Sequence, residues 1–169
     1  MEEITYKIVE TPAERRGYFA TRHAVFVEEQ GLFTGTDVDE HDDDAIHIIA
    51  ITRGSRRVVG AVRCYPAADD VWYGGRLAVL QVYRHHATAI GASLCRLAEA
   101  TVIERGCRCF LAYIQLKNVR FFQRLGWRAQ GEPVIYCGTP HLLMAASLVK
   151  KPVVSRQLSV VGTAEPLNR

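Results

Sequence analysis

One stretch, from Trp72 to Gly106, constrains the fold of this 169-residue chain more than any other. Residues 72–79 are rich in aromatic and aliphatic side chains, which is typical of a β-strand. Gly106 is a helix stop signal. Between these points, apolar side chains recur at the spacing of one helix face, at Ile90, Leu94, Leu97 and Ala98. The stretch therefore predicts a strand, a turn and a long amphipathic helix in succession.

The turn between these two elements, residues 83–91 (YRHHATAIG), is basic at first and then built mainly from small residues. Backbone N–H groups at the start of a helix point outward, and the helix dipole favours an anion there. A phosphate or pyrophosphate site is therefore one interpretation. The other is an ordinary solvated basic loop, and the turn alone favours neither.

The composition fits a single globular domain. With 49% hydrophobic residues, the chain can bury a full core. We expect this domain to span residues 1–151, because residues 152–169 show no core pattern and are predicted to form a mobile tail. No apolar run approaches the roughly 20 residues that cross a bilayer, and the N-terminal MEEITYK is unlike a signal peptide. A cytoplasmic protein without a membrane partner is the expectation.

Residues 37–44 (DVDEHDDD) hold six of the 18 acidic side chains. They fail the EF-hand calcium template, since Asp42 stands at the glycine position and Ile48 at the final glutamate position. We expect a solvated loop; the alternative is an electrostatic collar that attracts a cationic amine. The rest of the chain is basic, which suits a polyphosphate ligand. No Lys/Arg run with interleaved aromatic residues indicates a nucleic-acid partner.

The five cysteines fit a reducing compartment. Cys107 and Cys109 alternate along a predicted strand, and no second pair gives the ligand spacing of a zinc site. We therefore expect free, buried thiols and no metal.

The remaining elements follow from capping signals and periodicity. Residues 11–14 form a capping box with proline at the first helical position, and Gly31 is expected to end this helix. Further strands are predicted at 4–9, 47–52, 57–65, 107–115, 127–138 and 141–148, and a short helix at 117–125. The predicted order is β-α-β-β-β-α-β-α-β-β.

This order, together with four motifs, resembles the GNAT superfamily of acyl-CoA N-acyltransferases over roughly residues 4–148. The first helix carries Arg22-x-x-Val25-Phe26-Val27-x-Glu29-Gln30, which resembles a signature of one GNAT branch. Leu77-Ala78-Val79 and the turn to Gly91 resemble the strand and loop that bind coenzyme A. Residues 118–127 (NVRFFQRLGW) resemble the family's N-x-x-x-x-F-Y-x-x-x-G-F block, and Pro140-His141-x-x-Met144 resembles the last strand of the same branch.

The resemblance implies an α+β GNAT fold, with a central, mixed, mostly antiparallel twisted sheet of about seven strands and helices on both faces. It implies acetyl-CoA as the cofactor, the primary amine of a small molecule or peptide as the acceptor, and a homodimer as a form to consider. Arg22, Phe26 and Glu29 are the implied substrate-binding residues. The coenzyme is expected at Leu77, Ala78, Val79, Arg84, His85, His86, Ala87, Thr88, Ala89, Ile90, Gly91, Ala92, Asn118, Phe121 and Phe122.

Two departures from the family pattern concern the coenzyme and the leaving group. The usual loop reads R-G-x-G-x-G or Q-x-x-G-x-G, whereas residues 86–91 keep only Gly91, and the segment from Val79 is about two residues longer. Alanine can replace glycine where its φ stays negative. Many relatives have a tyrosine that protonates the leaving thiolate where this chain has Phe122, and phenylalanine cannot donate a proton.

Acyl transfer from a thioester to an amine requires a polarised carbonyl, a base and a stabilised thiolate. A backbone N–H that points outward at a bulge in residues 77–79 is expected to polarise the carbonyl. Glu29 and His141 are the candidate bases. A structural role stays open for each, since Glu29 could cap the helix or pair with Arg22, and His141 could be a hydrogen-bonded core residue.

The candidate acids are Tyr136, Tyr113 and Tyr73. Asn118 follows a predicted strand and begins a helix, which suits an N-cap, and the resemblance adds a contact with the pantetheine arm of the coenzyme. Two other functions stay open. One is a catalytically silent acyl-CoA-binding module, and the other is an enzyme similar to acyl-homoserine-lactone synthases.

Overall fold

The computed structural model describes residues 2–85 and 89–148 of the chain. The predictions for His86, Ala87, Thr88 and the tail at 152–169 lie outside these residues. No helix in the described part is long and apolar enough to cross a membrane.

Eight strands form one sheet in the order β1-β2-β3-β4-β5-β8-β6, and β7 also pairs with β8. These pairs are antiparallel except that of β4 with β5, which is parallel. This confirms the predicted mixed, mostly antiparallel sheet. The strands are β1 (Ile4–Ile8), β2 (Ile46–Thr52), β3 (Val58–Pro66), β4 (Val71–Val79), β5 (Cys109–Gln115), β6 (Arg128–Ala129), β7 (Val134–Tyr136) and β8 (Thr139–Ala145).

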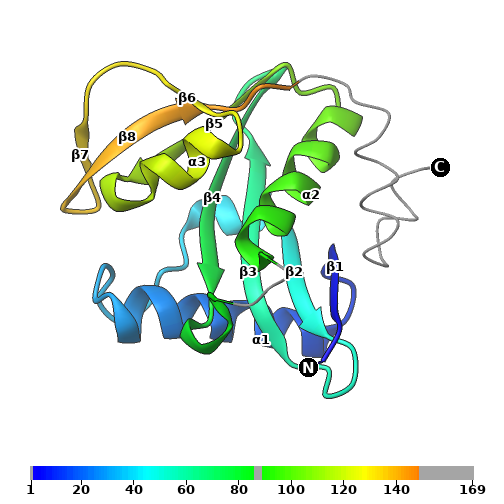
Figure 1. Cartoon of the computed structure of the whole chain (residues 1–169). Coiled ribbons are helices and arrows are strands. Elements are labelled where there is room, and N and C mark those ends of the chain that lie inside the picture. The colour runs from blue at the N-terminus through cyan, green and yellow to red at the C-terminus, as the bar shows by residue number, and fades with distance from the viewer. Residues whose placement is uncertain (1, 86–88, 149–169) are drawn as a thin grey trace.

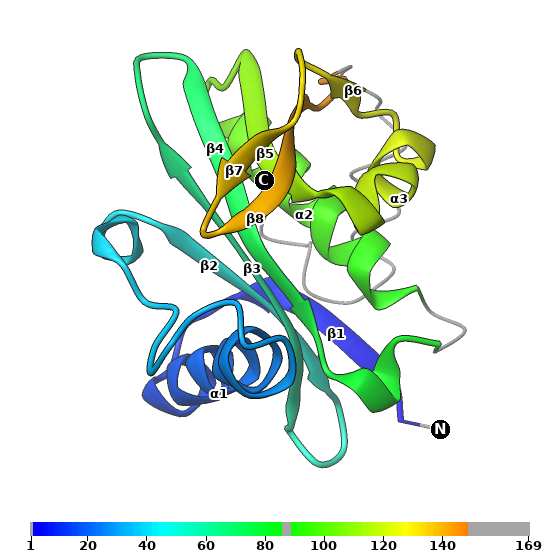
Figure 2. The same ribbon diagram turned by 90° about the vertical axis from the view of Figure 1, so that its left-hand side faces the viewer.

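Helices cover both faces of the sheet, as Figure 2 shows. Helix α1 (Pro12–His23) lies on one face, and α2 (Ile90–Glu104) and α3 (Val119–Arg124) lie on the other. Alternation along β2 explains this arrangement, because neighbouring side chains point to opposite faces. Ile48 packs in the core that includes α2, whereas Ile49 packs with Tyr18 of α1. Three short 3₁₀ turns are η2 (Glu40–Asp43), η3 (Gln81–Tyr83) and η4 (Leu116–Asn118).

The start of α1 is confirmed and its end is corrected. Thr11 Oγ1 accepts a hydrogen bond from the Glu14 N–H at 3.1 Å, and the Glu14 carboxylate accepts one from the Thr11 N–H at 3.2 Å. The α-helix ends at His23 and continues as a π-helical segment, η1 (Ala24–Glu29), before Gly31 turns the chain at φ +60°. Within η1, Phe26 is buried in a separate small cluster with Ala78 of β4.

The region from 127 to 138 is also corrected. It was predicted as one strand, but it forms two short strands, β6 and β7, on either side of Gly131 at φ +99°. A left-handed residue of this kind turns the chain and interrupts a strand. All five cysteines are free thiols; Cys107 is buried and Cys109 is half-buried.

Strands β4 and β5 are joined at one end only. Their pairing runs from Val71–Cys109 to Tyr73–Leu111, and beyond it β4 diverges from the strands β5, β8 and β7 (Figure 1). Strand β4 also contains a bulge, since Gly75 to Ala78 lies opposite only Ala61 to Arg63 of β3. The bulged residue Arg76 has φ +53°. The sheet is therefore split between β4 and β5 beyond these paired residues.

Candidate active site

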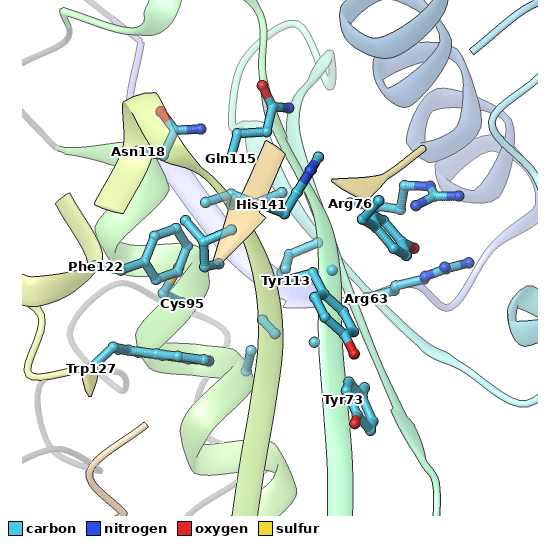
Figure 3. Close-up of a pocket in the computed structure, with 18 of the residues that line it drawn as sticks. Arg63, Tyr73, Arg76, Cys95, Tyr113, Gln115, Asn118, Phe122, Trp127 and His141 are labelled. Atoms are coloured by element: carbon cyan, nitrogen blue, oxygen red, sulfur yellow. The ribbon is translucent and has the colours of Figure 1, made fainter. Parts of the chain in front are cut away.

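A cavity of about 110 Å³ lies where β4 and β5 diverge. Figure 3 shows that its labelled lining residues fall into two groups, with His141 and Gln115 between them. We call the group that includes Cys95, Asn118, Phe122 and Trp127 the α2 half, because Cys95 belongs to that helix. The second group includes Arg63, Tyr73, Arg76 and Tyr113, and we call it the α1 half. Because the cavity crosses the sheet, ligands that enter from opposite faces can meet inside it.

The N-terminus of α2 lies at the predicted phosphate turn. The first N–H groups of this 15-residue helix have no intrahelical partner, as in any α-helix, and the N-cap residue Ala89 offers no side-chain acceptor to them. Ala89 does not meet the condition under which alanine replaces glycine without strain, because it lies in the left-handed region at φ +47°. Gly91 packs against the ring of Phe121, where an added Cβ would lie 3.4 Å from Cζ.

His141 is 3% exposed and lines the cavity. Its Nδ1 lies 2.7 Å from the Thr139 carbonyl oxygen, which can only accept a hydrogen bond. Nδ1 therefore carries the proton in the neutral ring, and Nε2 keeps a lone pair. A histidine held in this tautomer can accept a proton at Nε2.

Glu29 is placed differently from His141. It is not among the cavity-lining residues, and it receives two hydrogen bonds from the guanidinium of Arg84, at 2.5 and 2.6 Å. The hydrogen bonds from Arg84 hold the pKa of Glu29 below its ordinary value. Arg84 Nε also donates to the Val79 carbonyl oxygen at 2.9 Å. These contacts favour a structural role, in which the pair ties η1 to the end of β4.

Arg22 was expected to contact substrate, and the structure places it in the protein interior instead. It is fully buried. Its Nε donates to Asp37 at 2.7 Å, and its two Nη atoms donate to Asp42 at 2.6 and 3.0 Å, to Tyr18 and to the Asp37 carbonyl. All five N–H groups of the guanidinium thus have partners. No donor remains for a substrate.

The expectation of a solvated acidic loop is wrong for three of its members. Asp37 and Asp42 are buried, and Asp39 pairs with Arg63 at 2.6 Å and with Arg76 at 3.2 Å. Burial raises the pKa of Asp42, but hydrogen bonds from Arg22 outweigh burial and hold that pKa well below its ordinary value. The remaining acids of the loop, Glu40, Asp43 and Asp44, are exposed.

The predicted coenzyme residues divide between the cavity and its surroundings. Leu77, Asn118 and Phe122 line the cavity, as do the predicted substrate residue Phe26 and the candidate acids Tyr73, Tyr113 and Tyr136. Asn118 occupies the N-cap position of α3, but its side chain makes no capping hydrogen bond, so the capping prediction is wrong. Predicted residues that are described but do not line the cavity are Ala78, Val79, Arg84, His85, Ala89, Ile90, Gly91, Ala92 and Phe121.

Sequence reasoning missed Tyr65, Arg63, Arg76 and the pair Gln30–Gln115. The two glutamine side chains hydrogen-bond at 3.0 Å and join η1 to β5. The sequence signal for Tyr65 and Arg63 was their two-residue spacing, which places both on the same face of β3. Nothing in the sequence indicated that Arg76 lines the cavity, because its left-handed backbone conformation depends on the β4 bulge.

The chain matches the model of the acetyltransferase (GNAT) family over residues 9–127. It is 31% identical over 129 residues to a protein of Bacillus subtilis (strain 168) named as an acetyltransferase, which covers 75% of this chain and 84% of that protein. The crystal structure of a Lactobacillus plantarum protein named as an N-acetyltransferase superposes with a TM-score of 0.77 at 28% identity, over 87% of this chain and 99% of that one. BjaI, a CoA-dependent acyl-homoserine lactone synthase, superposes with a TM-score of 0.73 at 18% identity, over 95% and 90% of the two chains.

Proposed function

This chain belongs to the GNAT acetyltransferase family, and on that premise we propose that it transfers an acetyl group from acetyl-CoA to the primary amine of a small molecule. The observation that carries the proposal is the cavity at the divergence of β4 and β5. A thioester that enters along the α2 half and an amine that enters along the α1 half would meet at His141, which lies between the two.

The reaction follows from the groups at this point. The amine nitrogen attacks the thioester carbonyl, a C–N bond forms, and the C–S bond breaks to release the thiolate of coenzyme A. The nitrogen then loses its remaining extra proton to the thiolate or to water, which leaves the amide. Before attack, the ammonium loses a proton to His141 Nε2, directly or through a water. The carbonyl oxygen gains negative charge in the transition state, and a backbone N–H at the β4 bulge around Arg76 would stabilise it.

The residues present fit coenzyme A on the α2 side of the sheet. The N-terminus of α2, which has no side-chain cap, would bind the pyrophosphate through its N–H groups and dipole, and Arg84 and His85 precede it. Leu77, Asn118 and Phe122 would line the path of the pantetheine arm from there into the cavity. When bound, the coenzyme supplies the activated acyl group, and these residues hold it in place.

The experiment that tests this proposal measures both binding and turnover. Coenzyme A at 100 times its Kd should stabilise the fold by about 2.7 kcal/mol, seen as a rise in Tm. Addition of acetyl-CoA and a panel of primary amines should then release thiol. A missing Tm shift at millimolar coenzyme would exclude the cofactor, and binding without thiol release would favour a silent acyl-CoA-binding module.

Ala89→Asp should abolish the Tm shift caused by coenzyme A, because it sets a negative charge against the phosphates. The matched control is Ala89→Asn. Asparagine and aspartate both tolerate the left-handed backbone observed at Ala89, so the two variants differ mainly in charge. We expect the asparagine variant to keep the shift, and equal shifts in both variants would place the phosphates elsewhere.

Phe122→Tyr should raise kcat, by up to about 10²-fold if the new hydroxyl acts as a general acid. Phe122 is 6% exposed and lines the α2 half, where the leaving thiolate would lie. Phe121→Tyr adds the same hydroxyl to the neighbouring ring, which does not line the cavity, and should give no gain. An unchanged or lower kcat in Phe122→Tyr would mean that another group, such as Tyr136 or Tyr113, already protonates the thiolate.

A second candidate function is supported by the likeness to BjaI, which indicates a shared fold. In an enzyme of that kind, S-adenosylmethionine would supply the amine. Thiol release that depends on S-adenosylmethionine and not on simple amines would favour this function.

A further inference from the structure

Four tyrosine rings are stacked in a row across the sheet. Neighbouring centroids lie 6.1 Å apart for Tyr65–Tyr73, 6.2 Å for Tyr73–Tyr113 and 5.0 Å for Tyr113–Tyr136, and the ring planes differ by 7° to 16°. We call these residues the tyrosine ladder. All four line the cavity.

Strand register produces the ladder. Tyr65 of β3 pairs directly with Tyr73 of β4. Tyr73 pairs with Leu111 of β5, and Tyr113 follows two residues later on the same face. The sequence neighbours of these tyrosines, Cys64, Trp72 and Ala112, point the other way, into the core that contains α2. The ladder therefore belongs to the face of the sheet from which the acceptor would enter.

One end of the tyrosine ladder, Tyr136, contacts the proposed base, His141. The ring of Tyr136 packs edge to face against that of His141, with centroids 5.1 Å apart and planes at 72°. A ligand ring that packs next to Tyr136 would therefore place a short side chain of that ligand near His141. Phe26 and Phe33, from η1 and the segment that follows it, add two further aromatic rings to the cavity wall.

The ladder offers ring edges and neutral hydroxyls. None of its four hydroxyl groups hydrogen-bonds to another residue within the described ranges. Burial raises the pKa of Tyr65 to about 12 and also raises the pKa of Tyr73. Both therefore stay uncharged donors at neutral pH.

The charged side chains that line the described part of the cavity are held in ion pairs. No aspartate or glutamate is among the lining residues, and the two lining arginines, Arg63 and Arg76, are both paired with Asp39. The charge of Arg63 is balanced by Asp39, although its Nε has no hydrogen-bond partner among the described residues. This lining favours an acceptor recognised by aromatic contacts and by the neutral tyrosine hydroxyls.

We propose that the acceptor is an arylalkylamine, whose aromatic ring packs on the tyrosine ladder and whose amino group reaches His141. This inference rests on the proposed function, because it names the acceptor for that reaction. Tyr113 is the central test position, since it stacks between Tyr73 and Tyr136 and is 37% exposed.

The experiment compares 2-phenylethylamine with 2-cyclohexylethylamine, which has the same carbon skeleton without an aromatic ring. In the wild-type protein, kcat/KM should favour the phenyl compound by about 2- to 10-fold, the range of an aromatic pair. The preference should persist in Tyr113→Phe, which keeps the ring, and should be lost in Tyr113→Leu. Equal kcat/KM for both amines in the wild type, or a preference that survives Tyr113→Leu, would overturn the proposal.

A binding titration of the same two amines in the presence of coenzyme A separates this proposal from the reaction itself. Tighter binding of the phenyl compound without turnover would support the ladder and contradict the acetyltransferase function. Turnover of both amines with no difference in binding or rate would contradict the ladder alone. Neither binding nor turnover of either amine would overturn both.

Discussion

Replacement of His141 by glutamine is expected to lower kcat by about 10²- to 10⁴-fold, the usual contribution of a general base. Its Nδ1 proton is held by the Thr139 carbonyl at 2.7 Å, which leaves Nε2 as the proton acceptor in the cavity. Glutamine retains a polar side chain of similar size but cannot accept the proton. The rate should be measured at saturating acetyl-CoA and amine, so that the loss appears in kcat.

The pH profile identifies the base independently of the size of the loss. The rising limb of kcat against pH reports loss of a proton from the base, so it should disappear in His141→Gln. Glu29→Gln removes the other candidate and should keep the rising limb, because the Glu29 carboxylate is bound by Arg84. If Glu29→Gln loses the limb and His141→Gln keeps it, the two assignments are reversed.

Arg22→Met is expected to lower the free energy of unfolding by about 3–5 kcal/mol, because it leaves the buried carboxylates of Asp37 and Asp42 without their main partner. For a chain of this size, about 2–4 °C of Tm is lost per kcal/mol, so Tm should fall by about 6–20 °C. Denaturant or thermal unfolding gives both quantities. Arg53→Ala is the matched control, since Arg53 and its partner Glu3 are both mostly exposed. It should cost less than about 1 kcal/mol.

The same network predicts how stability depends on acid. The pKa values of Asp39 and Asp42 are lowered in the folded state, where hydrogen bonds from Arg63 and Arg22 outweigh the effect of burial. Their contribution to stability is therefore fully present above the unfolded pKa, about 3.9, and is lost as the pH falls through the folded values. In the wild type, stability should fall steeply below about pH 4. Equal acid dependence in the wild type and in Arg22→Met would contradict this account.

Local signals in the sequence predicted the elements well. The capping box at Thr11 and the strand–turn–helix centred on β4 and α2 depend on contacts within a few residues, and both are observed. The single strand expected over 127–138 was wrong, because the apolar residues on either side of Gly131 belong to separate strands that both pair with β8. Pairing with β8 sets the boundary between the two strands. The hydrophobic periodicity of residues 127–138 does not reveal this boundary.

Less of the candidate site could be predicted from the sequence. The acidic residues 37–44 were predicted to be solvated because their partners, Arg22, Arg63 and Arg76, come from three different elements. Net charge in a segment cannot show which carboxylates will be paired in the fold. The tyrosine ladder was missed for the same reason, since it exists only once β3, β4, β5 and β7 are in register.

Acetyl-CoA labelled in its acetyl group tests the central claim most directly, namely that a thioester and an amine meet in the cavity between β4 and β5. After incubation with the panel of primary amines, which includes 2-phenylethylamine, the product mixture is analysed by mass spectrometry and the free thiol is measured in parallel. The account predicts N-acetylated amine that carries the label, in an amount equal to the thiol released, and loss of both in His141→Gln. Thiol release with labelled acetate in place of the amide, or bound coenzyme with neither product, would contradict it.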